Sequence, residues 1–154
     1  THGARTAVDA CRYMATLILG ALNNETKDTL LTANYWPPGW MAEGTALAPE
    51  VEEIARGSFK ERQPPQIKGS GYVVRSLEAA LWAFFRSNDF RTGALLAANL
   101  GDDADTTAAI YGQLAGAFYG EDDIPESWRS RLAMYDEIAA IADWLLTAAN
   151  FDTT

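Results

Sequence analysis

The chain has 154 residues, of which 48% are hydrophobic and 21% are charged, and its formal net charge is −9. This length suits a single domain that buries roughly 70% of its unfolded surface. The chain is acidic and has no run rich in lysine and arginine, which argues against binding to nucleic acid or to an anionic membrane. No apolar run approaches the roughly 20 residues of a membrane span. No signal peptide is visible either, so a cytoplasmic setting is expected.

The first predicted element is a helix over about residues 4–22. Val8, Cys11, Ala15 and Ile18 recur at three- and four-residue spacing, which predicts an apolar face on this helix. Cys11 is the one cysteine of the chain, so an internal disulfide is excluded. On this face it is expected to be a buried small hydrophobe.

Two shorter helices are predicted next. One covers about residues 24–33, after which the sequence Tyr-Trp-Pro-Pro-Gly-Trp at 35–40 interrupts regular structure. The other covers about residues 48–57, because a proline near its start suits the first turn of a helix. Residues 58–66 are polar and contain two adjacent prolines, so they are expected to form an exposed connection.

A glycine-rich run, Gly69-Ser70-Gly71-Tyr72, leads into a strongly apolar helix over residues 76–85 that is expected to be central. Its glycines allow a ligand to approach the backbone closely, although such a run is a weak signal by itself. The pattern leaves two interpretations open for Tyr72, which are packing in the core and stacking on a ligand.

The densest group of polar side chains is Asn-Leu-Gly-Asp-Asp-Ala-Asp-Thr-Thr at 99–107, between a helix predicted over about 88–99 and an alanine- and glycine-rich helix over 108–117. Another helix can approach such a small-residue helix closely. Carboxylate and hydroxyl oxygens are the ligands that Mg²⁺ or Ca²⁺ takes, and Asp103 and Thr106 are one helical turn apart.

Capping of the following helix is the alternative role for these acids, since carboxylates suit a helix N-terminus. The residue types alone leave the two interpretations open. Three neighbouring acids are more than a cap needs, however, and they repel one another unless a cation offsets their charge.

A short restart at 124–128 and a final helix over about 130–149 complete the chain, and no alternating strand pattern of useful length is present. The predicted fold class is therefore all-α, as one compact orthogonal helical bundle over residues 1–154.

Three blocks of the sequence resemble the ADP-ribosylglycohydrolase family, which includes the dinitrogenase-reductase-activating glycohydrolase and the ADP-ribosylarginine hydrolases. The blocks occur in the family's order and at compatible spacing. They are Thr-His … Ala … Ala-Cys at the start, Gly-x-Gly-Tyr-Val-Val … Leu-Glu-Ala-Ala-Leu-Trp-Ala-Phe at 69–84, and Asn-x-Gly-x-Asp-x-Asp-Thr at 99–106. The family motif has two glycines before its first metal-binding aspartate, and here Asp102 replaces the second, which bears on the local turn.

The resemblance implies a fold that binds two Mg²⁺ ions and a hydrolase that removes ADP-ribose from a modified protein side chain or a small acceptor. By position, it implies Asp103, Asp105 and Thr106 as metal ligands, with Asp103 and Asp105 also as the catalytic acids. The implied substrate-binding residues are Ser70, Gly71, Tyr72, Asn99 and Gly101.

The family's metal site has a second half, a Thr-Asp-Asp segment, and this sequence does not contain it. The resemblance therefore covers the C-terminal half of the family fold. Two kinds of partner are expected, namely a separate N-terminal polypeptide that completes the fold, or a second copy bound through exposed apolar faces. The alternative function is a catalytically incomplete nucleotide- or metal-binding or helical interaction module. The sequence leaves the acceptor open between arginine, serine and others.

Overall fold

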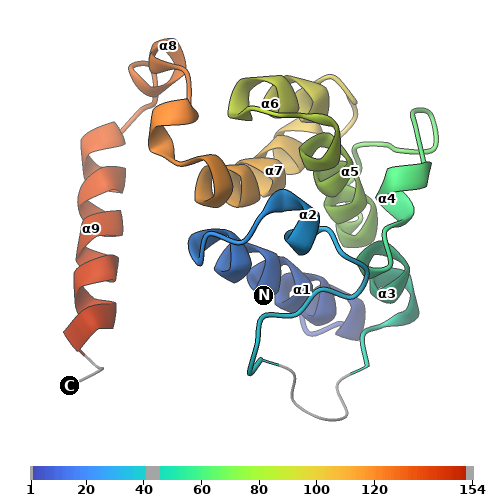
Figure 1. Cartoon of the computed structure of the whole chain (residues 1–154). Helices are drawn as coiled ribbons and strands as arrows, with labels where there is room; N and C mark the ends of the chain where they lie inside the picture. The colour runs from blue at the N-terminus through green and yellow to red at the C-terminus, as the bar shows by residue number, and fades with distance from the viewer. Residues whose placement is uncertain (1, 41–45, 152–154) are drawn as a thin grey trace. The chain divides into compact units, whose positions relative to one another are not determined.

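A computed structural model describes residues 2–40 and 46–151, and every regular element of these residues is helical (Figure 1). This confirms the all-α prediction. The described chain divides into two units, Thr1–Asp123 and Ile124–Thr154. The first unit contains α1 Arg5–Leu22, α2 Lys27–Leu30, α3 Pro49–Ala55, α4 Ser58–Glu61, α5 Val73–Arg86, α6 Phe90–Ala98, α7 Ala104–Tyr119 and the 3₁₀ turn η1 Glu121–Asp123, and the second contains α8 Glu126–Arg129 and α9 Tyr135–Phe151.

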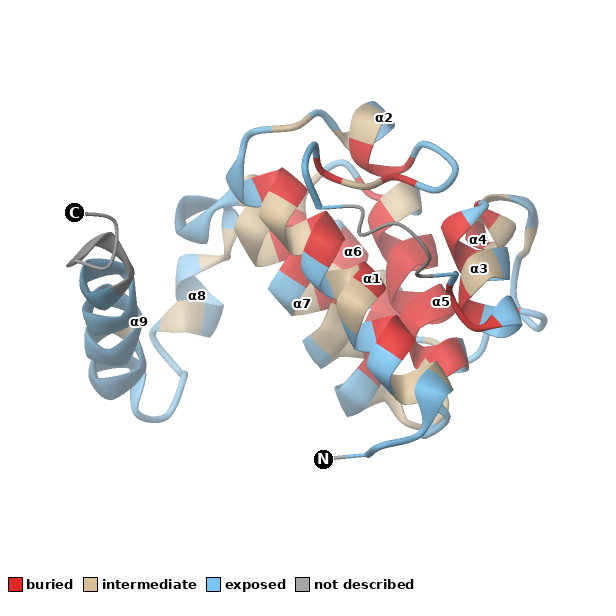
Figure 2. Ribbon diagram, turned by 90° about the horizontal axis from the view of Figure 1, so that it is seen from below, coloured by how far each residue is buried: buried red, intermediate tan, exposed pale blue. Residues whose placement is uncertain are grey.

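Helix α5 is the centre of the first unit, as its apolar sequence predicts. It packs against α1, α3, α4, α6 and α7, and Leu77, Ala80 and Phe84 are almost completely buried. Figure 2 shows buried residues along nearly the whole of this helix. Because α5 begins directly after the glycine-rich run, packing of the core holds the end of that run in place.

Helix α1 buries a different face from the one its apolar spacing predicts. Tyr13 and Leu17 are buried on the inner side, whereas Val8 is 44% exposed and Cys11 is exposed. The prediction that Cys11 is buried is therefore wrong. The small and polar side chains that accompany Tyr13 on the inner face carry little hydrophobic signal, so the sequence pattern favours the outer stripe.

Several element boundaries also differ from the prediction. The helix expected over 24–33 is a single turn, α2, whose first residue follows the capping residue Thr26. The connection expected over 58–66 contains α4, because Phe59 is buried. No helix of the described residues combines the length and the apolar character needed to cross a membrane.

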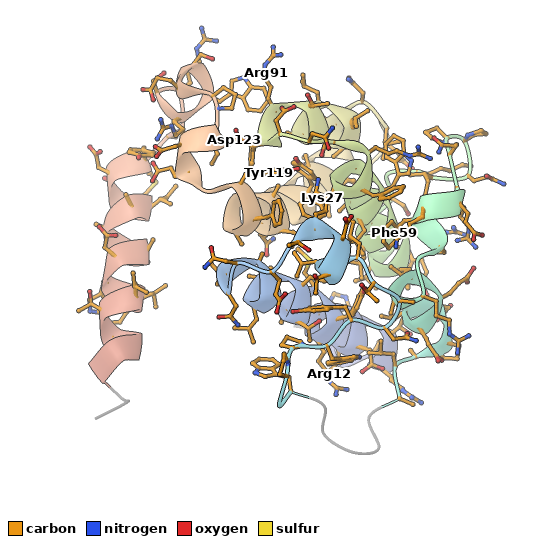
Figure 3. All side chains as sticks on the ribbon, in the orientation of Figure 1. Arg12, Lys27, Phe59, Arg91, Tyr119 and Asp123 are labelled. Atoms are coloured by element: carbon orange, nitrogen blue, oxygen red, sulfur yellow. The ribbon has the colours of Figure 1, made fainter. Side chains whose placement is uncertain are left out.

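The Lys27 ammonium ties α2 to the ends of α5 and α7. It donates hydrogen bonds to the carbonyl oxygens of Phe84 (2.9 Å) and Ser87 (2.6 Å) and to the Tyr119 hydroxyl (2.6 Å), and Figure 3 labels Lys27 and Tyr119 at this junction. Burial lowers the pKa of Lys27 to about 8, and the nearby charge of Asp89 partly opposes this shift. A cation at the C-terminus of α5 also suits the helix dipole.

The second unit has a different character, because none of its described side chains is buried. Glu126 and Arg129 form an ion pair of 2.9 Å within α8. The exposed large apolar side chains on and just before α9 are Leu132, Met134, Tyr135, Ile138, Ile141, Trp144, Leu145 and Leu146. This unit therefore has no core of its own in the described residues.

Two glycines of the helix pair α6 and α7 have opposite surroundings. A Cβ on Gly93 would overlap the Tyr111 hydroxyl and the Ser87 hydroxyl, and Tyr111 donates a hydrogen bond of 3.0 Å to the Phe90 carbonyl there. A Cβ on Gly112 would meet no atom within 4 Å. Gly93 is thus required for α6 to approach α7, whereas Gly112 faces open space.

We expect Gly93→Ala to lower the free energy of unfolding by about 1–3 kcal/mol, because the added methyl group displaces the Tyr111 hydroxyl. The matched variant Gly112→Ala should raise it by about 0.5–1 kcal/mol, because alanine replaces glycine in a helix interior without a clash. Urea denaturation followed by circular dichroism measures both changes. Equal effects at the two positions would contradict this description of the α6–α7 contact.

Candidate functional site

The predicted site residues lie at the turn between α6 and α7. Asn99 ends α6, and Gly101 and Asp102 follow in the left-handed region, with φ of 71° and 53°. Asp103 then precedes the first residue of α7. Two successive left-handed residues reverse the chain sharply, and this reversal delivers the Asp103 side chain to the N-terminus of α7.

Asp103 does not act as a side-chain cap of α7. It occupies the N-cap position of α7, yet its carboxylate accepts no backbone N–H of that helix. Its Oδ1 instead accepts a hydrogen bond of 2.9 Å from the Thr106 hydroxyl. The residues one helical turn apart therefore meet, as the spacing predicts, and the Asp103 carboxylate is left available for a ligand.

Asp105 stands beside this pair on the exposed first turn of α7. Its Oδ1 accepts the backbone N–H of Thr106 at 2.9 Å. This hydrogen bond, followed by an interaction with the Asp103 side chain, holds the pKa of Asp105 below its ordinary value. An ionised carboxylate next to a second carboxylate and a hydroxyl is a donor set that suits a hard cation such as Mg²⁺.

These three side chains supply only some of the ligands that a divalent cation needs. Among the described residues, no group of three histidine, cysteine, aspartate or glutamate side chains is arranged to hold a metal ion. Asp102 lines a hollow together with Lys68, Gly69, Ser70 and Arg75. Asp103, Asp105 and Thr106 therefore fit one side of a magnesium site, and the remaining ligands would be water or groups from elsewhere.

The glycine-rich run lies directly against this turn, although the two segments are about 30 residues apart in the sequence. A Cβ on Gly69 would overlap the Gly101 carbonyl oxygen, and a Cβ on Gly71 would lie 3.4 Å from Asp103 Oδ2. Only a residue without a side chain allows the first of these backbone approaches. The structure thus brings together two of the three sequence blocks, at the carboxylate of Asp103.

Ser70 and Tyr72, in the same run, are held by hydrogen bonds. The Ser70 hydroxyl accepts the Tyr72 backbone N–H at 3.1 Å, and the Ser70 carbonyl accepts the Ser76 hydroxyl. The Tyr72 hydroxyl donates a hydrogen bond of 3.1 Å to Glu50 of α3. Burial of the hydroxyl, and then the bond to Glu50, raise the pKa of Tyr72.

Tyr72 faces a cleft and is not a core residue. It is 47% exposed and lines a cavity of about 870 Å³ between α1 and the start of α5. Packing in the core, one of its two open interpretations, is therefore wrong. The cavity also takes in His2 and Gly71, so the first sequence block borders it, together with Ala4, Thr6, Ala7, Val8, Cys11, Arg12, Ala15 and Val73.

The structure differs from the sequence expectations at two positions around the site. The Asn99 side chain makes no hydrogen bond to any described residue, so it does not brace the turn in the described chain. The sequence gives no signal for Glu50, which accepts the Tyr72 hydroxyl, because no spacing rule connects α3 with the glycine-rich run. Gly69 does carry a sequence signal, since it is the first glycine of that run.

Comparison with protein families gives one match that covers nearly the whole chain. The family model for ADP-ribosylglycohydrolase matches residues 1–153. Among curated proteins, an ADP-ribosylarginine hydrolase of Pseudomonas putida is 41% identical over 149 residues, and one of Serratia proteamaculans is 35% identical over 149 residues. The ADP-ribosyl-[dinitrogen reductase] glycohydrolase of Rhodospirillum rubrum is 40% identical over 92 residues, which are 58% of this chain and 31% of that protein.

The matches cover this chain far more completely than they cover the relatives. The first two alignments span 97% of this chain but 38% of each relative. A solved structure titled "ADP-ribosylglycohydrolase-related protein complex" matches with a TM-score of 0.80 and 41% identity, over 92% of this chain and 47% of that one. The chain therefore spans less than half the length of these similar proteins.

We expect the left-handed residue Asp102 to be the one position of the turn where glycine is preferable. Asp102→Gly should raise the free energy of unfolding by about 0.5–1 kcal/mol, because glycine adopts positive φ without a side-chain penalty. Asp102→Val should lower it by about 1–2 kcal/mol, because a β-branched side chain is strained in this region. Chemical denaturation measures both, and a valine variant as stable as the original chain would show that the turn has a different backbone conformation.

Proposed function

Because the chain belongs to the ADP-ribosylglycohydrolase family, we propose that it supplies one side of a magnesium-dependent site that hydrolyses the bond between ADP-ribose and a modified side chain. The observation that carries the proposal is the position of Gly71 beside Asp103, where an added Cβ would lie 3.4 Å from Asp103 Oδ2. It joins a glycine-rich turn, open to a ligand, to the acidic cluster. A site that combines these two features can hold a sugar hydroxyl close to a cation.

Asp103, Asp105 and Thr106 are the residues that would hold Mg²⁺. When bound, the ion supplies positive charge that orients the ribose hydroxyls and a water molecule. In the family two such ions are expected, and the three residues here are ligands for only one side of that pair. Additional carboxylates from a further polypeptide segment would complete the coordination.

The acids would also serve the hydrolysis itself. In the proposed reaction a water oxygen bonds to the anomeric carbon of the ribose as the bond to the acceptor breaks. One carboxylate, Asp103 or Asp105, accepts the proton of that water, as a general base within hydrogen-bond reach can. The departing acceptor takes up a proton, and the ribose passes through an oxocarbenium-like state, as in other glycosyl cleavages.

Tyr72, Ser70 and Gly71 would border the nucleotide. The Tyr72 ring is exposed in the cleft while its hydroxyl is held by Glu50. A ring that is fixed at one end and open on its face can stack on a base or a ribose. Gly71 would allow the ligand to pass close to the backbone, and Asn99 and Gly101 belong to the α6–α7 turn against which this run lies.

ADP-ribosylated arginine is the proposed first substrate. Two of the similar curated proteins are named ADP-ribosylarginine hydrolases, and both align with almost the whole of this chain. The similarity to a protein named ADP-ribosyl-[dinitrogen reductase] glycohydrolase points equally to a modified protein side chain. A cytoplasmic setting fits such substrates.

A specific observation favours a second candidate function, which is a binding module without catalysis. Among the described residues the acidic cluster offers two carboxylates and one hydroxyl to a metal. Mg²⁺ held by so few protein ligands keeps most of its water and binds weakly. If this chain acts alone, nucleotide or metal binding is the function that its own residues support.

The test is Mg²⁺-dependent release of ADP-ribose from ADP-ribosylated arginine, with an intact-mass measurement of the same sample to detect any second polypeptide. We expect release only when a completing polypeptide is present. Asp103→Ala should reduce it at least about 100-fold, because it removes a ligand and a candidate base. Asp102→Gly is the matched control and should retain activity, since Asp102 is not a proposed ligand and the family motif has glycine at this position.

Three results would count against the proposal. Release by the chain alone would show that no further polypeptide is required. Release that persists after EDTA treatment would remove the role of magnesium. Equal loss of activity in the Asp102→Gly and Asp103→Ala variants would indicate general disruption of the turn instead of a specific role for the acidic cluster.

A further inference from the structure

A polar hollow of about 520 Å³ on the first unit is distinct from the cleft that Tyr72 faces. Its walls come from the connection between α4 and α5 (Figure 1), from the start of α5 and from the α6–α7 turn. The hollow and the cleft share no lining residue. Three cationic side chains line the hollow, namely Arg62, Lys68 and Arg75.

These cations are concentrated in one place although the chain as a whole is acidic. Three of its 12 lysines and arginines line the hollow. Asp102 is the one acid among the described residues of the wall, so the lining side chains have a formal charge of +2. In a chain of net charge −9, such a local reversal of sign favours an anionic ligand.

A buried carboxylate fixes two of the three cations. Glu78 of α5 is 2% exposed, and its two oxygens accept hydrogen bonds from Arg62 Nη1 at 2.5 Å and from Arg75 Nη1 at 3.2 Å. The Ser58 hydroxyl donates to Glu78 Oε1 at 2.5 Å, and Arg62 is also paired with Glu53. Because a buried carboxylate with both oxygens paired holds its partners in place, the two guanidinium groups are positioned before a ligand arrives.

Lys68 and Arg75 keep donors that a ligand can use. The Arg75 side chain is 50% exposed, and within the described chain it is paired only through the bond of its Nη1 to Glu78. Lys68 is exposed and makes no hydrogen bond or ion pair with another described residue. Its backbone is held by the buried residues Ile67 and Gly69 on either side. A cation with a fixed backbone and an open side chain is well placed to bind an anion from solution.

The hollow lies beside the point at which the proposed reaction breaks its bond. Asp102 lines the hollow, and the next residue, Asp103, belongs to the acidic cluster. Ser70 also lines the hollow, whereas Gly71 and Tyr72 line the cleft proposed for the nucleotide. ADP-ribose in that cleft would leave the hollow to the other partner of the bond, which is the acceptor.

We propose that the hollow lined by Arg62, Lys68 and Arg75 binds carboxylate side chains of the modified protein that neighbour its ADP-ribosylated residue. Lys68 and Arg75 donate to these carboxylates, and Arg62 contributes positive charge behind them. The inference rests on the proposed function. It deepens that function by making an acidic neighbourhood of the modified residue the feature by which protein substrates are selected.

The experiment measures binding to the full chain in EDTA, by two-dimensional ¹H–¹⁵N NMR. The probe is a peptide with an unmodified arginine between glutamates, and its counterpart has glutamine in their place. We expect the acidic peptide to shift the amide signals of Lys68, Ser70 and Arg75. The glutamine peptide should bind about tenfold more weakly, because exposed ion pairs are lost, and added salt should weaken the acidic peptide in the same way.

Three variants test the assignment. Lys68→Gln should weaken binding of the acidic peptide about threefold and should retain the thermal stability of the original, because this side chain has no partner among the described residues. Arg75→Gln should have a similar effect on binding, while Arg62 keeps Glu78 paired. The matched control is Arg91→Gln on α6 (Figure 3), which removes the same charge outside the hollow and should leave binding unchanged.

Four outcomes would overturn the proposal. They are the absence of shifts at the hollow, equal binding of the two peptides, equal weakening by Lys68→Gln and Arg91→Gln, and tighter binding of inorganic phosphate or ADP-ribose than of the acidic peptide at these signals. The last would assign the hollow to the phosphates of the nucleotide. Binding of an unmodified peptide needs neither metal nor turnover, so its failure is distinguishable from failure of the proposed hydrolysis.

Discussion

The candidate site depends on one close approach between two backbones. The glycine-rich run can lie against the α6–α7 turn only because Gly69 has no side chain where it faces the Gly101 carbonyl. The core holds both segments, since α5 begins where the run ends and packs against α6 and α7. A substitution at Gly69 would therefore separate Gly71 from Asp103 without touching any proposed ligand.

The acidic cluster is the part of the chain on which the proposed magnesium site depends. Asp103 occupies a capping position without capping, and its carboxylate is oriented by the Thr106 hydroxyl. Asp105 remains ionised beside it, with its pKa lowered by the backbone N–H of Thr106. Neighbouring carboxylates in a chain of net charge −9 repel one another, and a divalent cation is the simplest group that offsets this repulsion.

Both units of the described chain also leave apolar side chains exposed. Unit Ile124–Thr154 has no buried side chain among its described residues, and the first unit leaves an apolar groove and open glycines along α1 and α7. Monomeric soluble proteins rarely expose large contiguous apolar patches. The similar proteins, which are more than twice as long as their matched parts, contain enough additional chain to cover such surfaces.

The sequence by itself determined the helical class, the central helix after the glycine-rich run and the acidic cluster, because these depend on local composition and on spacing within a few turns. Asp103 and Thr106 meet as their spacing predicts, and the family resemblance is confirmed by the match over residues 1–153.

Only the tertiary structure decided which face of α1 is buried, that Glu50 holds Tyr72, and that Gly69 lies on Gly101. Such contacts join residues far apart in the chain, and helical periodicity shows that a stripe is apolar but not what covers it. Cys11 illustrates the limit, since its pattern predicts burial while the described chain leaves it exposed.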